Sequence, residues 1–108
     1  MRRDIFQAIA DPVRREIIEL LAEDPLTINA VAEKFDVSRP AISKHLKILK
    51  ECEVIEFHRK GRERFCIIKP KTLIPAFVWI EQYEGLWKTK LDSFEKYLNK
   101  LQSEISKP

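Results

Sequence analysis

Cationic and hydroxyl side chains recur along one face of the segment 37–53, VSRPAISKHLKILKECE. If this segment is a helix, one side of it carries Arg39, Ser43, Lys44, Lys47 and Lys50. Arginine and lysine neutralise phosphates or hydrogen-bond to guanine edges, serine can bond to bases or phosphate, and the major groove of DNA admits one α-helix. This face therefore indicates contact with double-stranded DNA, and a solvated basic helix face is the alternative.

Start and packing signals indicate that the segment is helical. Ser38 is a good N-cap, and Pro40 falls in the first turn, where its missing N–H costs little. Ile42, Leu46 and Leu49 follow at spacings of four and three, so they share one face. A helix this short is not stable alone. Its apolar stripe must therefore pack on other elements, which hold the cationic face outward.

Three helices are expected before this one, and they would supply that support. The first covers residues 3–10, and the second begins at Asp11, a cap that is followed by proline at the first helical position. After a short extended link at Leu26, Thr27 is the cap of a third helix over residues 28–35. Two short helices joined by three or four residues, the second of them basic, are typical of a helix-turn-helix.

A β-hairpin is expected after the basic helix. Residues 54–60 and 63–69 are rich in β-branched and aromatic side chains, and Gly61 and Arg62 separate them. Apolar residues fall on both faces of the second strand, so both faces are expected to be partly covered. A cationic hairpin here is a wing that can reach the phosphate backbone or a minor groove, and a hairpin kept soluble by charge is the alternative. The basic residues at its tip are Arg59, Lys60, Arg62 and Arg64.

One long helix is expected over residues 76–101, after Pro70 closes the hairpin and with Pro75 in its first turn. It would span about 39 Å at ~1.5 Å per residue, which is longer than packing against so small a domain requires. Its apolar residues alternate by four and three from residue 87, which is a heptad seam and favours pairing with a second helix. Packing within one subunit and an aromatic ligand pocket are the alternatives. The predicted dimer interface is Trp79, Tyr83, Trp87, Leu91, Phe94 and Leu98.

Charge is distributed unevenly along the 108 residues. The net charge is +3, but the stretch from Lys34 to Lys71 holds eleven basic and five acidic residues, so it carries +6 and the remainder −3. A basic centre between acidic flanks is the electrostatic pattern of a nucleic-acid surface with supporting elements behind it. No signal peptide and no apolar run near ~20 residues are visible, so we expect a cytoplasmic protein without a membrane partner.

Enzymatic chemistry is not expected. The sequence has no glycine-rich phosphate loop, no cluster of metal ligands and no nucleophile with a base at a recognisable spacing. The two cysteines, Cys52 and Cys66, do not make a disulfide framework. They are expected to be small buried hydrophobes, although a redox switch that couples the basic helix to the wing is the alternative.

The order of these elements, and above all DPVRREIIELL followed by SRPAISKHLKILKE, resembles the winged-helix repressors of the ArsR/SmtB family over nearly the whole chain. The resemblance implies a homodimeric regulator that binds inverted-repeat operators. For His45, packing or hydrogen bonding within the chain is the alternative to DNA contact. Matched by position, the implied DNA contacts are Ser38, Arg39, Pro40, Ser43, Lys44, His45 and Lys47, with Arg62 and Arg64 in the wing.

Two departures from the family pattern are visible. Metal-sensing members carry cysteines in the first helix of the helix-turn-helix, or Asp, His and Glu ligands on the terminal helix. Here residues 28–31 read INAV, and the only histidines are His45 and His58, so no metal or other cofactor is expected and the effector stays open. Glu53 stands where relatives usually have glycine in a left-handed turn, at a cost of roughly 1 kcal/mol.

The sequence thus predicts a mainly α fold with a small β-hairpin, a winged helix-turn-helix with a long C-terminal dimerisation helix. Residues 1–108 would form one domain, with a DNA-binding core over 1–70, the wing at 54–69 and the dimerisation helix within 71–108. The predicted function is a homodimeric repressor in which Arg39 and Ser43 read bases, while the lysines of the helix and the wing contact phosphates. A winged-helix module that binds protein, or a redox-sensing repressor that uses Cys52 and Cys66, is the alternative.

Overall fold

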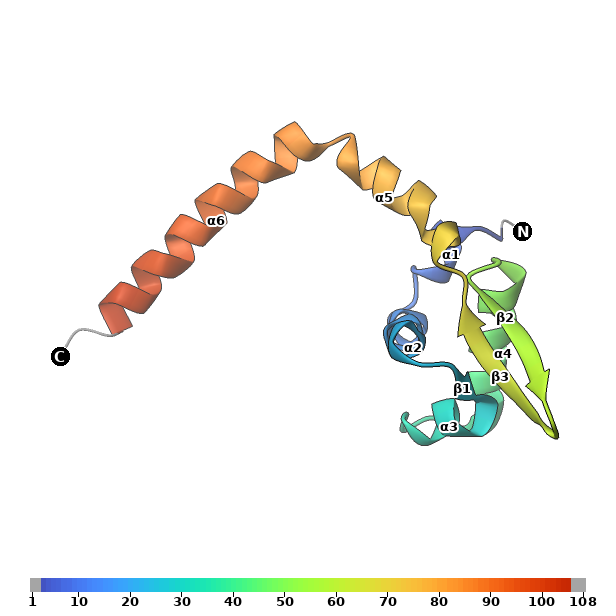
Figure 1. Ribbon diagram of the computed structural model, residues 1–108. Helices are drawn as coiled ribbons and strands as arrows, with labels where there is room; N and C mark the ends of the chain where they lie inside the picture. Colours follow the sequence, from blue (N-terminus) through green and yellow to red (C-terminus); the bar gives the residue numbers. More distant parts are fainter. Residues whose placement is uncertain (1–2, 106–108) are drawn as a thin grey trace. The chain divides into compact units, whose positions relative to one another are not determined.

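The computed structural model describes residues 3–105, except for the side chain of Trp87, and the chain divides into two units, Met1–Ala76 and Phe77–Pro108. Figure 1 shows the elements in chain order. They are α1 (Ile5–Ala8), α2 (Pro12–Glu23), β1 (Leu26–Thr27), α3 (Ile28–Glu33), α4 (Arg39–Glu51), β2 (Ile55–Lys60), β3 (Glu63–Ile68), the 3-10 helix η1 (Pro70–Leu73), α5 (Ile74–Glu81) and α6 (Glu84–Ile105).

The helices of the first unit begin where the sequence places caps. The side chains of Asp11, Thr27 and Ser38 accept hydrogen bonds of 2.9 to 3.2 Å from amides two or three residues further on. These bonds satisfy N–H groups that have no partner within the helix, which confirms the three predicted starts. Three boundaries differ from the prediction: α1 begins only after a further cap at Asp4 and already ends at Ala8, and α3 ends at Glu33.

The predicted apolar stripe of α4 lies in the core of the first unit. Ile42, Leu46 and Leu49 are fully buried, together with Ile17 of α2 and Val31 of α3. α4 contacts α2, α3 and β2, so the helix is fixed from three sides. Since the stripe occupies one side of α4, its opposite side is held toward solvent, as the pattern predicts.

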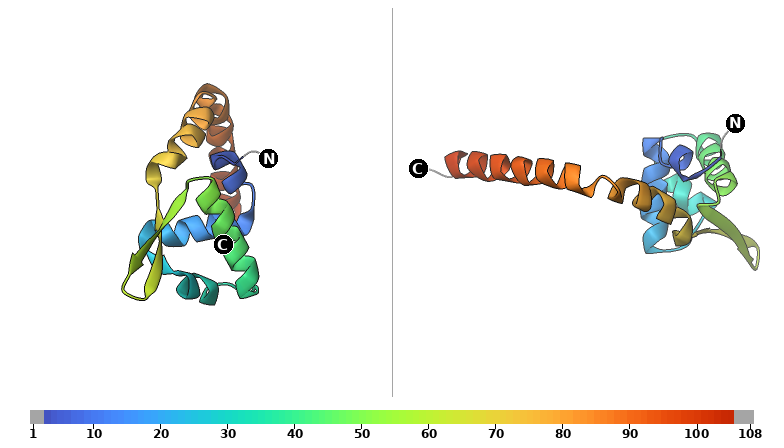
Figure 2. Two further views of the ribbon diagram at one scale, coloured as in Figure 1. Left: turned by 90° about the vertical axis from the view of Figure 1, so that its right-hand side faces the viewer. Right: turned by 90° about the horizontal axis from the view of Figure 1, so that it is seen from above.

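The predicted hairpin is present and belongs to a three-stranded antiparallel sheet in the order β1-β3-β2. The third strand, β1, consists of two residues, and Leu26 pairs with Cys66 of β3. Phe65, Ile67 and Ile68 are half-buried and Cys66 is buried, so both faces of β3 are partly covered, as expected. Figure 2 shows the tip of the hairpin extending beyond the helices of this unit.

A left-handed residue ends α4. Glu53 has φ +62°, its amide donates to the Lys50 carbonyl at 2.9 Å, and the Val54 amide donates to the Leu49 carbonyl at 3.0 Å. This pair of bonds is a Schellman motif, which usually has glycine at the left-handed position. The Thr72 hydroxyl donates to the Glu53 carbonyl at 2.6 Å, so the strained residue is also held from the segment that follows the wing.

Replacing this residue by glycine should stabilise the protein. We expect Glu53→Gly to raise the free energy of unfolding by about 0.5–1 kcal/mol, because relief of the left-handed strain outweighs the added freedom of glycine in the unfolded chain. Urea unfolding followed by circular dichroism measures the change. Glu53→Ala removes the same carboxylate but keeps Cβ, so it should bring no gain. Equal stabilisation by both variants would assign the effect to charge and not to the backbone.

The predicted long C-terminal helix is present as α6, but the expected continuous helix over residues 76–101 is wrong, because α5 and α6 divide that stretch. The Tyr83 amide donates to the Ile80 carbonyl at 3.1 Å, three residues back, which closes α5 with a tight turn. α5 is built largely from aromatic and β-branched residues with weak helix propensity, and Gly85 follows the break. Pro75 lies in the first turn of α5, as predicted.

The apolar residues of the second unit are exposed. Trp79 and Tyr83 meet edge to face with ring centroids 5.6 Å apart. Leu91, Phe94 and Leu98 follow the heptad spacing along α6, and the five side chains are 42 to 57% exposed. Trp87 lies within α6, and its side chain falls outside the described residues. Exposed apolar side chains at a regular helical spacing are typical of surfaces that contact another molecule, so the dimer interface stays a prediction.

Candidate nucleic-acid interface

The exposed side of α4 carries the predicted DNA contacts. Ser43, Lys44 and Lys47 are exposed there, as are Ser38 and Pro40 at the start of the helix. Lys50 continues the same cationic side toward the helix end, where a positive charge is also favoured by the helix dipole. The buried stripe and this face share one helix, so the packing that fixes α4 also fixes the direction of the cations.

His45 lies at the edge of this face and faces the start of α2. Its side chain is 22% exposed, and its Nδ1 lies 3.5 Å from Nη1 of Arg14 and 3.9 Å from Oδ2 of Asp11. These contacts are the local packing that the sequence left as an alternative. DNA contact by His45 stays a prediction.

Arg14 is a structural residue of the site that sequence reasoning missed. Its side chain is 9% exposed, and it donates from Nε to the Ala8 carbonyl at 3.0 Å and from Nη2 to the Gln7 carbonyl at 2.9 Å. These carbonyls end α1, and the Gln7 carbonyl also accepts from the Ala10 amide at 3.2 Å, so Arg14 adds donors to the C-terminal end of this short helix. With its third nitrogen near His45, the guanidinium joins α1 and α2 to α4.

Asp11 completes this cluster as a carboxylate. Burial raises the pKa of Asp11, but the amide hydrogen bond from Arg14 and the charges of His45 and Arg14 lower it, and the net result lies below the usual value. The ionised form therefore belongs to the folded state at neutral pH, where it caps α2 and lies beside His45.

Loss of this cap should be measurable and pH-dependent. We expect Asp11→Ala to lower the free energy of unfolding by about 1–2 kcal/mol at neutral pH. Because the folded-state pKa is depressed, this contribution is fully present above the unfolded value of about 3.9 and is lost as the pH falls through the folded value. Urea unfolding at several pH values should therefore show the gap between wild type and variant closing in acid. Asp11→Asn keeps a capping oxygen and should lose less, and a gap that widened in acid would contradict the assignment.

The wing is joined to the end of α4 through Phe57. The Arg64 guanidinium lies 4.6 Å from the centroid of the Phe57 ring, and Nζ of Lys50 lies 5.4 Å from it. Cations near an aromatic face at these distances are attracted by the ring. Cationic side chains of α4 and β3 are thus held on one aromatic residue of β2, while Arg59, Lys60 and Arg62 are exposed toward the hairpin tip.

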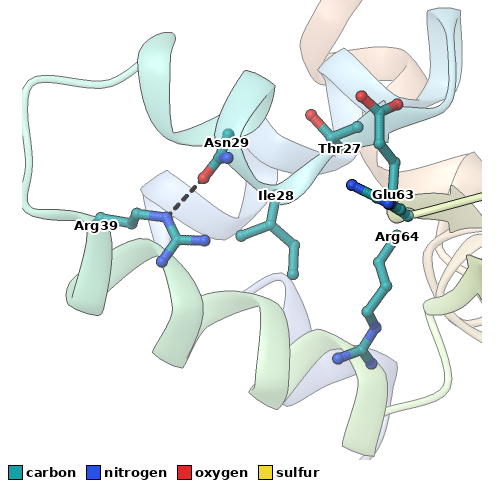
Figure 3. Close-up of a pocket in the computed structure, with 7 residues that line it drawn as sticks. Thr27, Ile28, Asn29, Arg39, Glu63 and Arg64 are labelled. Carbon is teal, nitrogen blue, oxygen red and sulfur yellow. Dashed lines mark hydrogen bonds between the residues drawn. The ribbon is translucent and has the colours of Figure 1, made fainter.

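A pocket of about 250 Å³ lies where α3, α4 and the wing meet (Figure 3). Arg39 reaches it from the first turn of α4, and its Nε donates to Oδ1 of Asn29 on α3 at 2.8 Å. Asn29 is a second residue that sequence reasoning missed, because only the fold brings it to Arg39. The polar side chains that line the pocket are Thr27, Asn29, Arg39, Arg62, Glu63 and Arg64.

The two cysteines offer little support for a redox switch. Both are buried. Burial raises the pKa of the Cys52 thiol and raises that of the Cys66 thiol to about 11, although nearby Arg64 opposes the second shift. Reactive cysteines are accessible and favour the thiolate, and these two have neither property.

Among residues 3–105, no three His, Cys, Asp or Glu side chains gather into a group that could hold a metal ion. None of the helices in the described range has the length and apolar character that crossing a membrane requires.

The chain is similar to known regulators. A family model described as "Bacterial regulatory protein, arsR family" matches residues 11–56, which span α2 to the start of β2. The transcriptional repressor SdpR of Bacillus subtilis is 42% identical over 77 residues, 71% of this chain and 86% of SdpR. The HTH-type transcriptional regulator Rv2034 of Mycobacterium tuberculosis is 41% identical over 94 residues, 87% of this chain and 85% of Rv2034.

A solved structure has a similar fold over three quarters of this chain. It is the homodimeric winged helix-turn-helix DNA-binding domain of Mb0332 from Mycobacterium bovis, a possible ArsR-family transcriptional regulator. The TM-score is 0.60 at 25% identity, over 75% of this chain and 77% of that one. The fold, the buried and exposed sides of α4, and the two long sequence matches agree with one another. The chain belongs to the ArsR family of bacterial regulatory proteins.

Proposed function

We propose that this protein is a sequence-specific DNA-binding repressor that acts as a homodimer on an inverted-repeat operator. The observation that carries the proposal is the outward cationic side of α4, fixed by a fully buried stripe and continued by a basic wing. Membership of a family of regulatory proteins agrees with it. Such a protein would act in the cytoplasm, with double-stranded DNA and a second copy of itself as partners.

Within this proposal, α4 is the recognition helix. Ser43 lies in the exposed middle of the helix, and its short hydroxyl side chain suits hydrogen bonds to base edges. Lys44 and Lys47 are long and flexible and suit phosphates. The wing would contact the backbone beside the site, because its tip extends beyond the helices. The full set of proposed contacts is Ser38, Arg39, Pro40, Ser43, Lys44, His45, Lys47, Arg62 and Arg64.

The proposed dimer uses the apolar residues of the second unit. Their heptad spacing on α6 and their exposure call for a partner helix, and the similar domain from Mycobacterium bovis is homodimeric. Residues 1–70 would then bind DNA and residues 71–108 would pair. A two-fold axis would set the recognition helices about 34 Å apart, so that they enter successive major grooves on one side of the duplex.

The test is a fluorescence-anisotropy titration of the purified protein against DNA from upstream of its own gene and against scrambled DNA, at several salt concentrations. Tight, salt-sensitive binding with a preference for the upstream DNA is expected of a self-regulating repressor. Equal binding to both would leave a DNA-binding protein whose operator lies elsewhere. No binding at low salt would contradict the proposal and favour a winged-helix module that binds protein.

Lys47 separates affinity from specificity. We expect Lys47→Ala to weaken binding to upstream and scrambled DNA about equally, by roughly tenfold at moderate salt, because a phosphate contact carries no sequence information. Ser43→Ala should instead reduce the preference for upstream DNA. Anisotropy titrations with both duplexes measure the two effects, and Lys34→Ala, at the C-cap of α3, is the charge-matched control. If Lys47→Ala changed the preference as strongly as Ser43→Ala, this division of roles would be wrong.

A further inference from the structure

The pocket between α3, α4 and the wing collects positive charge from two elements. Arg39 comes from the start of α4, and Arg62 and Arg64 come from the wing. One carboxylate, Glu63, also lines the pocket. In Figure 3 Glu63 extends toward the side where Thr27 lies, and Arg39 approaches from the other side. The excess of cations makes the pocket suitable for an anion.

Two of the arginines are held in place by contacts that leave donors available. The Nε–H of Arg39 is used by Asn29, which leaves the N–H groups of both Nη atoms for a ligand. The guanidinium carbon of Arg64 lies 4.6 Å from the centroid of the Phe57 ring, so the ring restrains this side chain without supplying an acceptor oxygen. Arginine side chains that are already oriented suit the paired oxygens of a phosphate group.

The shape of the site favours a phosphate over a base. Base edges in a duplex lie on the floor of a groove, where they are reached by side chains that project from a helix. A phosphate projects from the backbone and can enter a concave site between two elements. The hydrogen bond to Asn29 of α3 directs the Arg39 side chain into the pocket, which is a concave site of this kind.

We propose that this pocket binds one phosphate group of the DNA backbone in each protomer, and that Asn29 is the positioning residue that presents Arg39 to it. This inference rests on the proposed function and replaces the sequence-based assignment of Arg39 to base reading. Residues of the helix-turn-helix and of the wing would contact the same phosphate. That shared contact would fix how the two elements are oriented on the duplex.

The first experiment is a double-mutant cycle on DNA affinity and its salt dependence. Arg39→Ala should reduce the slope of log affinity against log salt by about 0.9 for each pocket, with equal loss on upstream and scrambled DNA. Asn29→Ala should weaken binding by roughly three- to tenfold. The double variant should bind no more weakly than Arg39→Ala alone, because Asn29 acts through Arg39. Asn99→Ala in α6, the same chemical change elsewhere, should have no effect.

A gain-of-function variant guards against misfolding as an explanation. Glu63→Gln removes the carboxylate from the pocket and should tighten DNA binding several-fold with a steeper salt dependence. Glu56→Gln on the neighbouring strand removes a carboxylate that is bonded to His58 and does not line the pocket. It should change the affinity clearly less. Equal tightening by both variants would indicate a general charge effect and overturn the role of the pocket.

Other outcomes separate this inference from the proposed function. If Arg39→Ala narrowed the preference for upstream DNA without changing the salt slope, Arg39 would read a base and the pocket proposal would fail while DNA binding stood. If additive losses were seen for Asn29 and Arg39, the positioning role would fail. At constant ionic strength, inorganic phosphate that displaced DNA from the wild type but not from Arg39→Ala would support the pocket as a phosphate site, because free and backbone phosphate would compete for the same donors. No DNA binding by the wild type would overturn both proposals together.

Discussion

Leu91→Asp is expected to convert the proposed dimer into a monomer and to weaken binding to the upstream DNA by about 100-fold or more. Leu91 is 52% exposed in the single chain and lies on the same row as Phe94 and Leu98. In a paired helix this position is buried, and a buried carboxylate without a partner is strongly unfavourable. A monomer also loses the gain of two linked half-site contacts, which is typically about 10²–10⁴ in affinity. Sedimentation velocity and anisotropy titrations measure the two effects.

The matched control is Asn99→Asp. It adds the same charge to α6, at a position beside the apolar row and outside it, and should leave the protein dimeric. Circular dichroism should show that unit Met1–Ala76 stays folded in both variants, because Leu91 belongs to the other unit. A Leu91→Asp variant that sedimented as a dimer would show that the heptad row of α6 is not the dimer interface. The aromatic pair Trp79 and Tyr83 would then be the next contact to test, with Trp79→Asp.

Local signals account for most of what the sequence predicted correctly. Three helix starts follow from Asp11, Thr27 and Ser38, whose side chains bond amides only two or three residues away. The buried side of α4 follows from the spacing of its apolar residues, and the hairpin follows from two β-rich runs around Gly61. Each of these features is decided within one turn or one strand, so a single sequence carries the whole signal.

Features that depend on distant contacts were not predictable in the same way. β1 is only two residues long and forms because Leu26 pairs with Cys66 of β3, forty residues further along the chain. The break between α5 and α6 was missed because one helix was extended from the heptad region back to residue 76, through residues that are weak helix formers. The left-handed residue was expected from the resemblance, and the structure confirms that Glu53 adopts it without being glycine.

In the candidate site, too, features set by local sequence were predicted and features set by distant contacts were not. The cations of α4 and the wing were recognised by type and spacing, but their supporting residues were not. Arg14 reads as one of two neighbouring arginines on a helix, and Asn29 reads as an ordinary exposed residue of α3. Their roles come from partners six to thirty-one residues away, which periodicity does not reveal. Asn29 and the DNA-binding residues await the experiments above, whereas Arg14 can be tested by stability alone.

Arg14→Met should lower the free energy of unfolding by about 2–4 kcal/mol. Methionine keeps much of the length of the side chain, but it cannot donate to the carbonyls of Gln7 and Ala8. The buried Ala8 carbonyl would lose its donor, at about 1–3 kcal/mol, whereas the Gln7 carbonyl keeps the Ala10 amide and loses one hydrogen bond, at about 0.5–1.5 kcal/mol. Because Arg14 also lies against His45, the start of α2 and the recognition helix should loosen together. Urea unfolding measures the loss, and hydrogen exchange should show faster opening of α1 and of the first turn of α2.

Arg15 provides the control that decides whether burial is the cause. It is the neighbouring arginine, is exposed, and donates from Nη1 to the Ile9 carbonyl at 2.7 Å. Arg15→Met removes the same charge and a hydrogen bond of similar length, but water can replace the lost donor, so the expected loss is below about 1 kcal/mol. A similar loss for both variants would show that charge or helix propensity dominates. A large loss for Arg14 alone would show that the recognition helix is held in place through a residue that has no contact with DNA in the proposed complex.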